Sequence, residues 1–405
     1  MIRPSWLDEV PVQRLLAALG AAGIEVRFVG GCVRDALLGQ ETGDIDVATP
    51  APPETVTAAL QAAKIKALPT GIAHGTVTAV LPRRTFEITT LRRDVETDGR
   101  HAVVAFGADW AEDAARRDFT INAIYLAPDG TIFDPVGGQA DLAARRVRFV
   151  GDPATRIAED VLRILRYYRF EARFGGGTGD AAARAACRAA AGKLPTLSAE
   201  RVWRELSRLI GGPDPVRALA MMRDDGVLAA ILPKATRIDR LERMIPLAAA
   251  DDVMLRLAAL VDAGMEDVAR IVGRLRLSNA EQQRLAGLVK PWLLVPDADA
   301  KAQRLSLYRL GREVFCDLAA LLAADGQLKP AALRKLLELA ETWEIPVFPL
   351  GGNDVTALGI APGRRVGRLL AAVRRWWEEG DFTADRAACL ARLREISAQP
   401  LPPAI

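Results

Sequence analysis

The chain has 405 residues, half of them hydrophobic and only 5% aromatic, so it is too long for one compact core and we expect two to four domains. Its formal net charge of +3 excludes a polybasic field over the whole protein, so any nucleic-acid surface has to be a local patch. Four widely spaced cysteines exclude a disulfide framework and indicate a reducing compartment, and two histidines exclude a multi-histidine metal centre.

The beginning of the chain does not have the pattern of a signal peptide, and the sequence contains no apolar run of about 18 residues. We therefore expect a cytoplasmic protein that makes no membrane contact. The sequence gives no sign of a required protein partner.

The first 150 residues predict an α+β head, in which helices accompany a mixed β-sheet. Alternating and β-branched segments indicate strands, and apolar residues three or four apart indicate helices. The predicted helices cover residues 10–22, 33–38 and 52–63, and the predicted strands cover residues 26–29, 44–47, 75–81, 85–91, 124–127, 131–133 and 147–150. Residues 92–109 have too little apolar periodicity for a packed element, which predicts a mobile loop.

From residue 152 onward the pattern is helical to the end of the chain. Residues 157–174 predict one continuous helix, and residues 180–191, 198–210 and 214–224 predict three more. We expect an all-α neck, body and tail after the head. The predicted domains are the head (1–146), the neck (147–232), the body (233–345) and the tail (346–405).

Two carboxylates open the second predicted strand. Asp44 and Asp46 are two residues apart, so their side chains share one face of the strand while Ile45 and Val47 face the core. Neighbouring carboxylates repel each other unless a cation lies between them, and their oxygens suit Mg²⁺. An Asp-x-Asp pair is common, however, and by itself also fits a polar strand end.

The segment before these aspartates favours the metal site. Gly30 and Gly31 allow a close approach to the backbone, and Arg34 and Asp35 follow on a short helix. Exposed N–H groups, an arginine and a metal pair together indicate a polyphosphate site. The alternative for Arg34 is a salt bridge to Asp35 or to the two aspartates. The whole stretch resembles the signature of the nucleotidyltransferase superfamily, and in detail that of class II tRNA CCA-adding enzymes and bacterial poly(A) polymerases.

The resemblance implies a third metal carboxylate on a later strand, and Glu87 in Phe86-Glu87-Ile88 matches it. From the residues alone, Glu87 could equally face water on an edge strand. The implied site holds two Mg²⁺ ions roughly 3.5–4 Å apart on Asp44, Asp46 and Glu87, for in-line attack of a hydroxyl on an α-phosphate. Gly31 and Arg34 match the phosphate-binding part of the family signature.

The stretch Arg116 to Ala123 resembles the second motif of the family, in which the residues at the positions of Arg117 and Asp118 contact the ribose. An aspartate that accepts from a 2′-hydroxyl would select ribonucleotides. The alternative is a cluster of charges at the start of a helix.

Asp160 and Arg163 are three residues apart within the predicted helix 157–174, so we expect them on one helix face. As an acceptor beside a donor, they would match the amino group and ring nitrogen of cytosine or adenine, and would mismatch guanine and uracil. The alternative is an ordinary surface ion pair. The segment resembles the amino-acid template of the class II family, which implies that Arg166 and Arg169 also face the nucleotide.

The resemblance implies a template-independent CCA tRNA nucleotidyltransferase that adds C, C and A to tRNA 3′ ends from CTP and ATP and releases pyrophosphate. Ser198 to Ile210 resembles the helix that braces the neck, and Leu350 to Arg368 loosely resembles the tail segment that meets the tRNA elbow. The alternative is a bacterial poly(A) polymerase or an A-adding enzyme. A catalytically dead tRNA-binding protein would have lost a carboxylate, and a small-molecule nucleotidyltransferase would need no Asp160–Arg163 pair.

Overall fold

The computed structural model describes residues 1–71, 75–97, 102–107, 109–247, 252–289, 294–295 and 298–398. The chain forms two compact units, one of Met1–Ala235 with Gly273–Arg276, the other of Thr236–Val272 with Leu277–Ile405. This division does not test the boundaries at 146 and 345, so the four-domain scheme stays a prediction. Within the described part of the chain, every helix is too short or too polar to cross a membrane.

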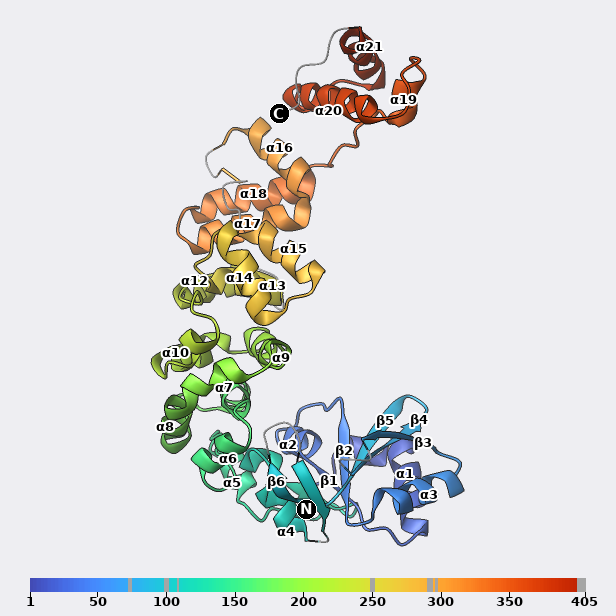
Figure 1. The fold of residues 1–405 in the computed structure, drawn as a ribbon, viewed down its shortest axis with the longest axis vertical. Coiled ribbons are helices and arrows are strands. Elements are labelled where there is room, and N and C mark those ends of the chain that lie inside the picture. Colours follow the sequence, from blue (N-terminus) through green and yellow to red (C-terminus); the bar gives the residue numbers. More distant parts are fainter. Residues whose placement is uncertain are drawn as a thin grey trace. The chain divides into compact units, whose positions relative to one another are not determined.

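The first unit begins with the predicted mixed sheet (Figure 1). Among the described residues, seven strands pair in the order β3-β4-β5-β2-β1-β8-β9. They are β1 (Arg27–Val29), β2 (Ile45–Thr49), β3 (Lys66–Gly71), β4 (Thr76–Leu81), β5 (Arg84–Thr90), β8 (Tyr125–Leu126) and β9 (Ile132–Phe133). β2 and β5 are parallel, whereas the other neighbours are antiparallel. The strand β3 was not predicted from the sequence.

Helices cover the sheet because their apolar residues match its two faces. On one face, Leu15 and Leu19 of α1 and Leu60 of α3 pack against Ile45 and Val47 in one core. The other face packs against α4, with Trp110 in edge-to-face contact with Tyr125. The helices of the head are α1 (Val10–Ala21), α2 (Gly31–Leu37), α3 (Pro53–Ala62), α4 (Trp110–Ala115) and α5 (Gly138–Ala143).

The prediction of a mobile loop over residues 92–109 was wrong for most of that segment. Residues 92–97 and 102–106 form β6 (Arg92–Thr97) and β7 (Ala102–Phe106), which pair with each other in an antiparallel ribbon. Such a ribbon forms through backbone hydrogen bonds, and neither the polar stretch Arg92–Thr97 nor the continuous apolar stretch Ala102–Phe106 has the alternation that signals a strand. Residues 98–101, including Asp98, Gly99 and Arg100, lie outside the described residues.

The predicted strand over residues 147–150 was also wrong. Its backbone makes one isolated bridge, between Phe149 and Phe119, rather than a ladder. The apolar side chains there pack instead: the ring of Phe149 stacks on that of Tyr167 with centroids 5.8 Å apart. Burial of Val147 and Phe149 therefore produced the strand-like pattern without a strand.

The continuous helix predicted over residues 157–174 is two helices, α6 (Pro153–Glu159) and α7 (Arg163–Phe174). Asp160 lies between them with extended backbone angles, φ −152° and ψ 107°. Its carboxylate accepts a hydrogen bond from the Leu162 N–H at 3.0 Å, which stabilises the break. The rest of the first unit is α8 (Ala181–Ala190), α9 (Ala199–Ile210), α10 (Pro215–Asp224) and α11 (Val227–Ile231).

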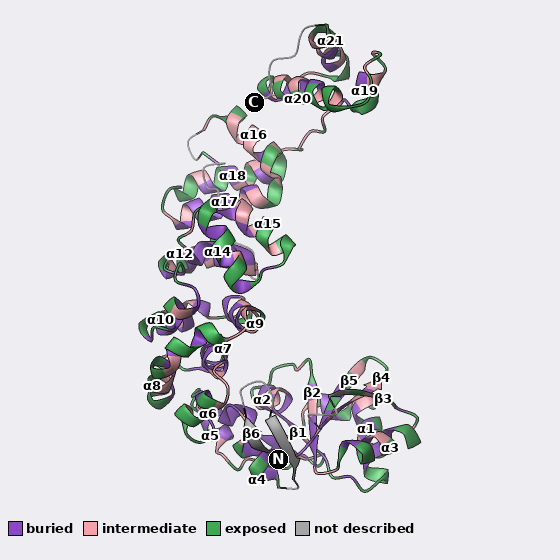
Figure 2. Ribbon diagram, in the orientation of Figure 1, coloured by how far each residue is buried: buried purple, intermediate pink, exposed green. Residues whose placement is uncertain are grey.

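Among the described residues of the second unit, the regular elements are helices. Leu255 and Leu257 of α13 and Phe315 and Leu318 of α17 are buried, and Figure 2 shows both helices as largely buried elements. Farther along the chain, Trp377 and Leu393 belong to a separate core. The helices of the second unit are α12 (Ile238–Met244), α13 (Val253–Leu260), α14 (Met265–Leu275), α15 (Asn279–Leu288), α16 (Ala300–Leu310), α17 (Arg312–Ala324), α18 (Pro330–Thr342), α19 (Gly352–Thr356), α20 (Arg364–Glu379) and α21 (Arg386–Ser397).

Candidate active site

The structure places Asp46 and Glu87 side by side on the sheet. They are register partners in the parallel pair of β2 and β5, so their side chains share one face. Glu87 is exposed, but β5 lies between β4 and β2, so the edge-strand alternative is excluded. Asp44 is exposed and comes immediately before β2. The side chain of Asp46 lies on the strand face that a cation shared with Asp44 and Glu87 would require. Ile45 and Val47 are buried, as predicted.

The carboxylates repel one another. The pKa of Asp46 is raised from 3.8 to about 6: burial is the largest cause, the negative charges of Glu87 and Asp44 add to it, and Arg117 opposes them. Oxygen donors that carry excess negative charge fit a hard divalent cation. Asp46 and Glu87 are therefore suited to a divalent metal ion, whereas the oxygens of Asp44, Asp46 and Glu87 do not all lie within 4.8 Å of one another in this structure.

A second acidic group does not have this character. Among the described residues, Asp252, Glu313 and Asp317 form the group whose carboxylate oxygens all lie within 4.8 Å. Arg284 makes ion pairs with all three, so a guanidinium already occupies the centre of that group. These ion pairs make the group a structural ion network within the second unit.

A turn brings backbone close to Asp46. Gly30 has φ 78°, which favours glycine, and a Cβ there would lie 3.9 Å from both an Asp46 carboxylate oxygen and an Arg117 guanidinium nitrogen. Gly31 begins α2 directly after this turn. The N–H groups of the first turn of α2 have no partner within the helix, as expected at any helix N-terminus.

A polar cavity of about 390 Å³ lies over Asp46 and Glu87, and Asp44 is not among the residues that line it. Arginines and threonines line it together with Asp46 and Glu87: Arg92, Arg116, Arg117, Thr76 and Thr89. The sequence reasoning did not assign a role to Arg92, Thr76 or Thr89. The available signal was position, since Arg92 lies two residues after the end of β5, and Thr89 lies two residues after Glu87 and therefore on the same strand face.

Arg117 is held in place by a buried acid that the sequence reasoning missed. Its Nε donates to a carboxylate oxygen of Asp113 at 3.2 Å and to the Tyr125 hydroxyl at 3.1 Å, and that hydroxyl donates to Asp113 at 2.6 Å. Asp113 is 1% exposed. The signal for it was its spacing four residues before Arg117, which places both on one helical face.

Asp118 is buried and its two oxygens are already engaged. One accepts from the Phe119 N–H at 2.9 Å and from the Asn122 amide at 3.1 Å, and the other accepts from Arg166 Nε at 2.8 Å. Burial would raise the pKa of Asp118, but Arg166 and these hydrogen bonds lower it on balance. Asp118 therefore links the head to α7.

Arg34 makes the ion pair that the sequence left open. Its guanidinium donates to Asp35 at 2.7 and 2.9 Å and to the Asn122 side chain at 2.6 Å, and it lies 4.1 Å over the ring of Phe174. Only 6% of Arg34 is exposed. In this structure the side chain is turned away from solvent and toward its protein partners.

Asp160 and Arg163 do not lie on one helix face, which corrects the prediction, because α6 ends before Asp160 and α7 begins at Arg163. Asp160 accepts from Arg201 of α9 at 2.7 Å, while Arg163 pairs with Glu159. The two residues remain close in the chain, since the Arg163 N–H donates to the Asp160 carbonyl at 3.0 Å.

Arg166 and Arg169 lie one turn apart on α7. Arg169 Nε donates to Glu205 at 2.6 Å, and an Arg166 nitrogen lies 3.9 Å from the same carboxylate. Glu205 is buried on α9 and was read only as part of a bracing helix. The structure thus joins Asp118, Arg166, Arg169 and Glu205 in one network of ion pairs.

Two segments of the chain match known protein families. Residues 26–148 match the family model described as "Poly A polymerase head domain", and residues 180–238 match "Probable RNA and SrmB- binding site of polymerase A". The chain is 35% identical to CCA tRNA nucleotidyltransferase 1, mitochondrial, from Mus musculus, over 92% of this chain and 87% of the relative. It is 29% identical to the CCA-adding enzyme of Limosilactobacillus fermentum, over 95% and 96% of the two chains.

A solved structure agrees with these relatives. The crystal structure of the Bacillus stearothermophilus CCA-adding enzyme in complex with CTP superposes with a TM-score of 0.78 at 29% identity. The superposition covers 96% of this chain and 98% of that chain. The similarity therefore extends beyond the head into the helical remainder.

Proposed function

The chain belongs to the family of CCA tRNA nucleotidyltransferases, and from this premise we propose that it adds C, C and A to tRNA 3′ ends from CTP and ATP, with release of pyrophosphate. The observation that carries the proposal is the pairing of Asp46 with Glu87 beneath a cavity lined by arginines. Carboxylates that share one face supply metal ligands, and the arginines supply charge for a triphosphate.

Asp44, Asp46 and Glu87 would hold divalent metal, which we propose to be two Mg²⁺ ions. When bound, the metal supplies a lowered pKa for the attacking RNA 3′-hydroxyl and neutralises charge on the phosphates. Arg117, fixed by Asp113 and Tyr125, faces the triphosphate with the backbone N–H of Gly31. Contact of Arg34 with a phosphate would require its guanidinium to leave Asp35 and Asn122.

The neck would choose the nucleotide. Asp118 accepts from the ribose hydroxyl in this proposal, and Asp160 with Arg163 matches the amino group and ring nitrogen shared by cytosine and adenine. Arg166 and Arg169 border the base. Because Asp160 already accepts a hydrogen bond from Arg201, and Arg163 already donates to Glu159, base selection has to exchange these contacts for contacts with the base.

The second unit would bind the part of the tRNA that lies away from the 3′ end. Arg364 and Arg365 are exposed at the start of α20, within the segment that resembles the elbow-binding tail. We propose the division into head, neck, body and tail on the same grounds. We also propose a cytoplasmic location; relatives of this chain include mitochondrial proteins.

The test is to incubate the purified protein with a tRNA lacking its CCA end and to sequence the products. CTP alone should add two C residues, and CTP with ATP should add CCA. Asp46→Ala should abolish incorporation, whereas Glu54→Ala, at an exposed position of α3, should leave it unchanged. A long A tract with ATP alone would refute CCA addition in favour of poly(A) synthesis.

A further inference from the structure

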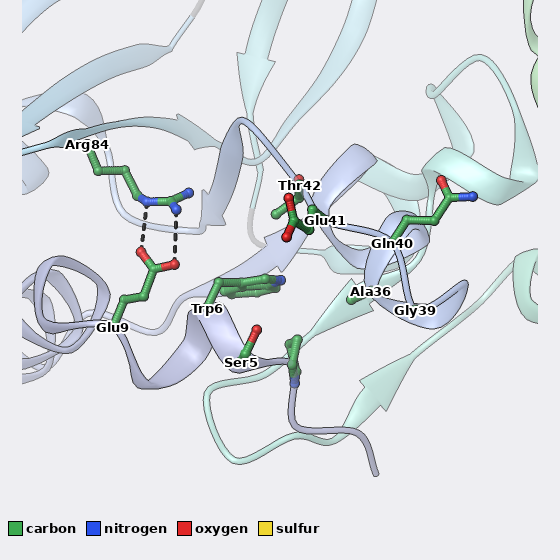
Figure 3. Close-up of a pocket in the computed structure, with 10 residues that line it drawn as sticks. Ser5, Trp6, Glu9, Ala36, Gly39, Gln40, Glu41, Thr42 and Arg84 are labelled. Atoms are coloured by element: carbon green, nitrogen blue, oxygen red, sulfur yellow. Dashed lines mark hydrogen bonds and ion pairs between the residues drawn. The ribbon is translucent and has the colours of Figure 1, made fainter. Parts of the chain in front are cut away.

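A second polar cavity lies next to the loop that carries Asp44. It has a volume of about 410 Å³, and residues of the N-terminus, of the loop and of β5 line it (Figure 3). Trp6 forms part of it and packs edge-to-face on Phe28, with centroids 4.8 Å apart. On its other side Glu9 and Arg84 face each other through two contacts of 3.0 Å (Figure 3).

Arg84 joins three segments that are distant in sequence. Glu9 is the N-cap residue of α1, and Arg84 is the first residue of β5, three residues before Glu87. A further guanidinium nitrogen of Arg84 donates to the Gly43 carbonyl at 3.3 Å. The planar fork of arginine can serve a carboxylate and a carbonyl at once, which a lysine nitrogen cannot do in this geometry.

The loop needs such a restraint because Asp44 has little else to hold it. Asp46 lies inside β2 with a ladder neighbour on each side, Val29 and Glu87. Asp44 precedes the strand and is exposed; its carbonyl accepts from the Thr42 hydroxyl at 3.1 Å. Gly39, with φ 67°, and Gly43 give the loop the backbone freedom of glycine.

We propose that Arg84, oriented by Glu9, is a positioning residue that sets Asp44 against Asp46 and Glu87 for divalent cation binding. The inference rests on the proposed function, because it assigns the cation to these carboxylates. Arg84 does not touch the reacting groups in this proposal; it acts through the Gly43 carbonyl.

The test compares Arg84→Met with Arg3→Met, which removes an arginine from an exposed ion pair with Asp8 at the same end of the chain. Mn²⁺ affinity is measured directly by electron paramagnetic resonance titration of the protein without nucleotide. The Mg²⁺ concentration for half-maximal CTP incorporation is measured separately. Arg84→Met should weaken both by about 5- to 10-fold while kcat at saturating Mg²⁺ stays within about 2-fold, and Arg3→Met should change neither.

Two further variants keep the test decisive if Arg84→Met folds poorly. Arg84→Lys keeps the charge beside Glu9 and should weaken Mn²⁺ binding by about 3-fold with an unchanged melting temperature, because one nitrogen cannot reach both partners. Glu9→Gln should have a similar effect. Wild-type Mn²⁺ affinity in Arg84→Lys and Glu9→Gln would overturn the proposal. Failure of wild-type protein to extend tRNA would instead refute the proposed function, since the Mn²⁺ titration does not depend on it.

Discussion

Replacing Asp46 by asparagine should abolish catalysis and yet stabilise the metal-free protein. The folded state holds this carboxyl at a pKa of about 6, against 3.8 ordinarily, because it is buried beside Glu87 and Asp44. A carboxyl whose pKa is raised by folding opposes folding once it ionises. Stability therefore falls as the pH rises from about 3.8 through about 6, and asparagine removes this loss.

The pKa difference sets the magnitude. At about pH 7.5, above both values, the ionised carboxylate costs about 3 kcal/mol, whereas at about pH 4.5 the cost is only about 1 kcal/mol. Asp46→Asn should therefore raise the free energy of unfolding by up to about 3 kcal/mol at the higher pH and by about 1 kcal/mol at the lower. The gain should also shrink when Mg²⁺ is added, because wild type then gains binding energy that the variant lacks.

Urea unfolding in EDTA, followed by tryptophan fluorescence at both pH values, measures these differences. Glu41→Gln is the matched control, because it removes one negative charge from an exposed position in the loop before Asp44. It should change stability by less than about 0.5 kcal/mol. Equal or lower stability of Asp46→Asn at pH 7.5, or a gain that does not depend on pH, would refute the reasoning that uncompensated charge is stored at this site.

Two other predictions concern the neck. Arg166→Met leaves the Asp118 carboxylate buried without its cation, so unfolding free energy should fall by about 2 kcal/mol at neutral pH, a value reduced because Arg166 is 32% exposed. The pKa of Asp118 is lowered in the folded state, so the stability difference between wild type and Arg166→Met should disappear as the pH falls below about 4. Urea unfolding at several pH values measures this difference. A difference that does not change with pH would contradict the role of Arg166 as the cation that compensates Asp118. Arg163→Ala should raise UTP and GTP incorporation relative to CTP by at least about 10-fold, while Arg156→Ala, which removes the other arginine on Glu159, should not. Product sequencing from an equal mixture of four NTPs measures the ratio, and an unchanged base spectrum in Arg163→Ala would contradict the template role.

The positions of the candidate carboxylates could be predicted from sequence because they depend on local patterns, and their catalytic roles stay predictions. Asp44 and Asp46 two residues apart, after a glycine turn, predict carboxylates on one strand face; β2 begins at Ile45, so Asp46 lies in the strand and Asp44 lies immediately before it. Ile45 and Val47 are buried as that alternation requires. The change from mixed elements to helices near residue 152 is likewise a matter of local periodicity, and the α+β head with a helical remainder was confirmed.

Contacts between distant segments could not be predicted in this way. The partner of Asp46 is Glu87, and their parallel pairing joins segments about 40 residues apart, for which local sequence carries no register signal. The break at Asp160 depends on a turn contact and on Arg201 from α9, and periodicity alone favours an unbroken helix. Arg34 is buried because aromatic residues of α7 cover it.

The sequence by itself therefore determined which chemical groups the protein carries and in what order. The family resemblance placed Glu87 with Asp46 in advance, whereas the tertiary structure alone decided that Arg166 meets Asp118 and that Arg84 meets the loop before Asp44. The physical reason is that side-chain direction follows from local backbone geometry, whereas strand register and helix docking follow from the burial of surfaces that are far apart along the chain.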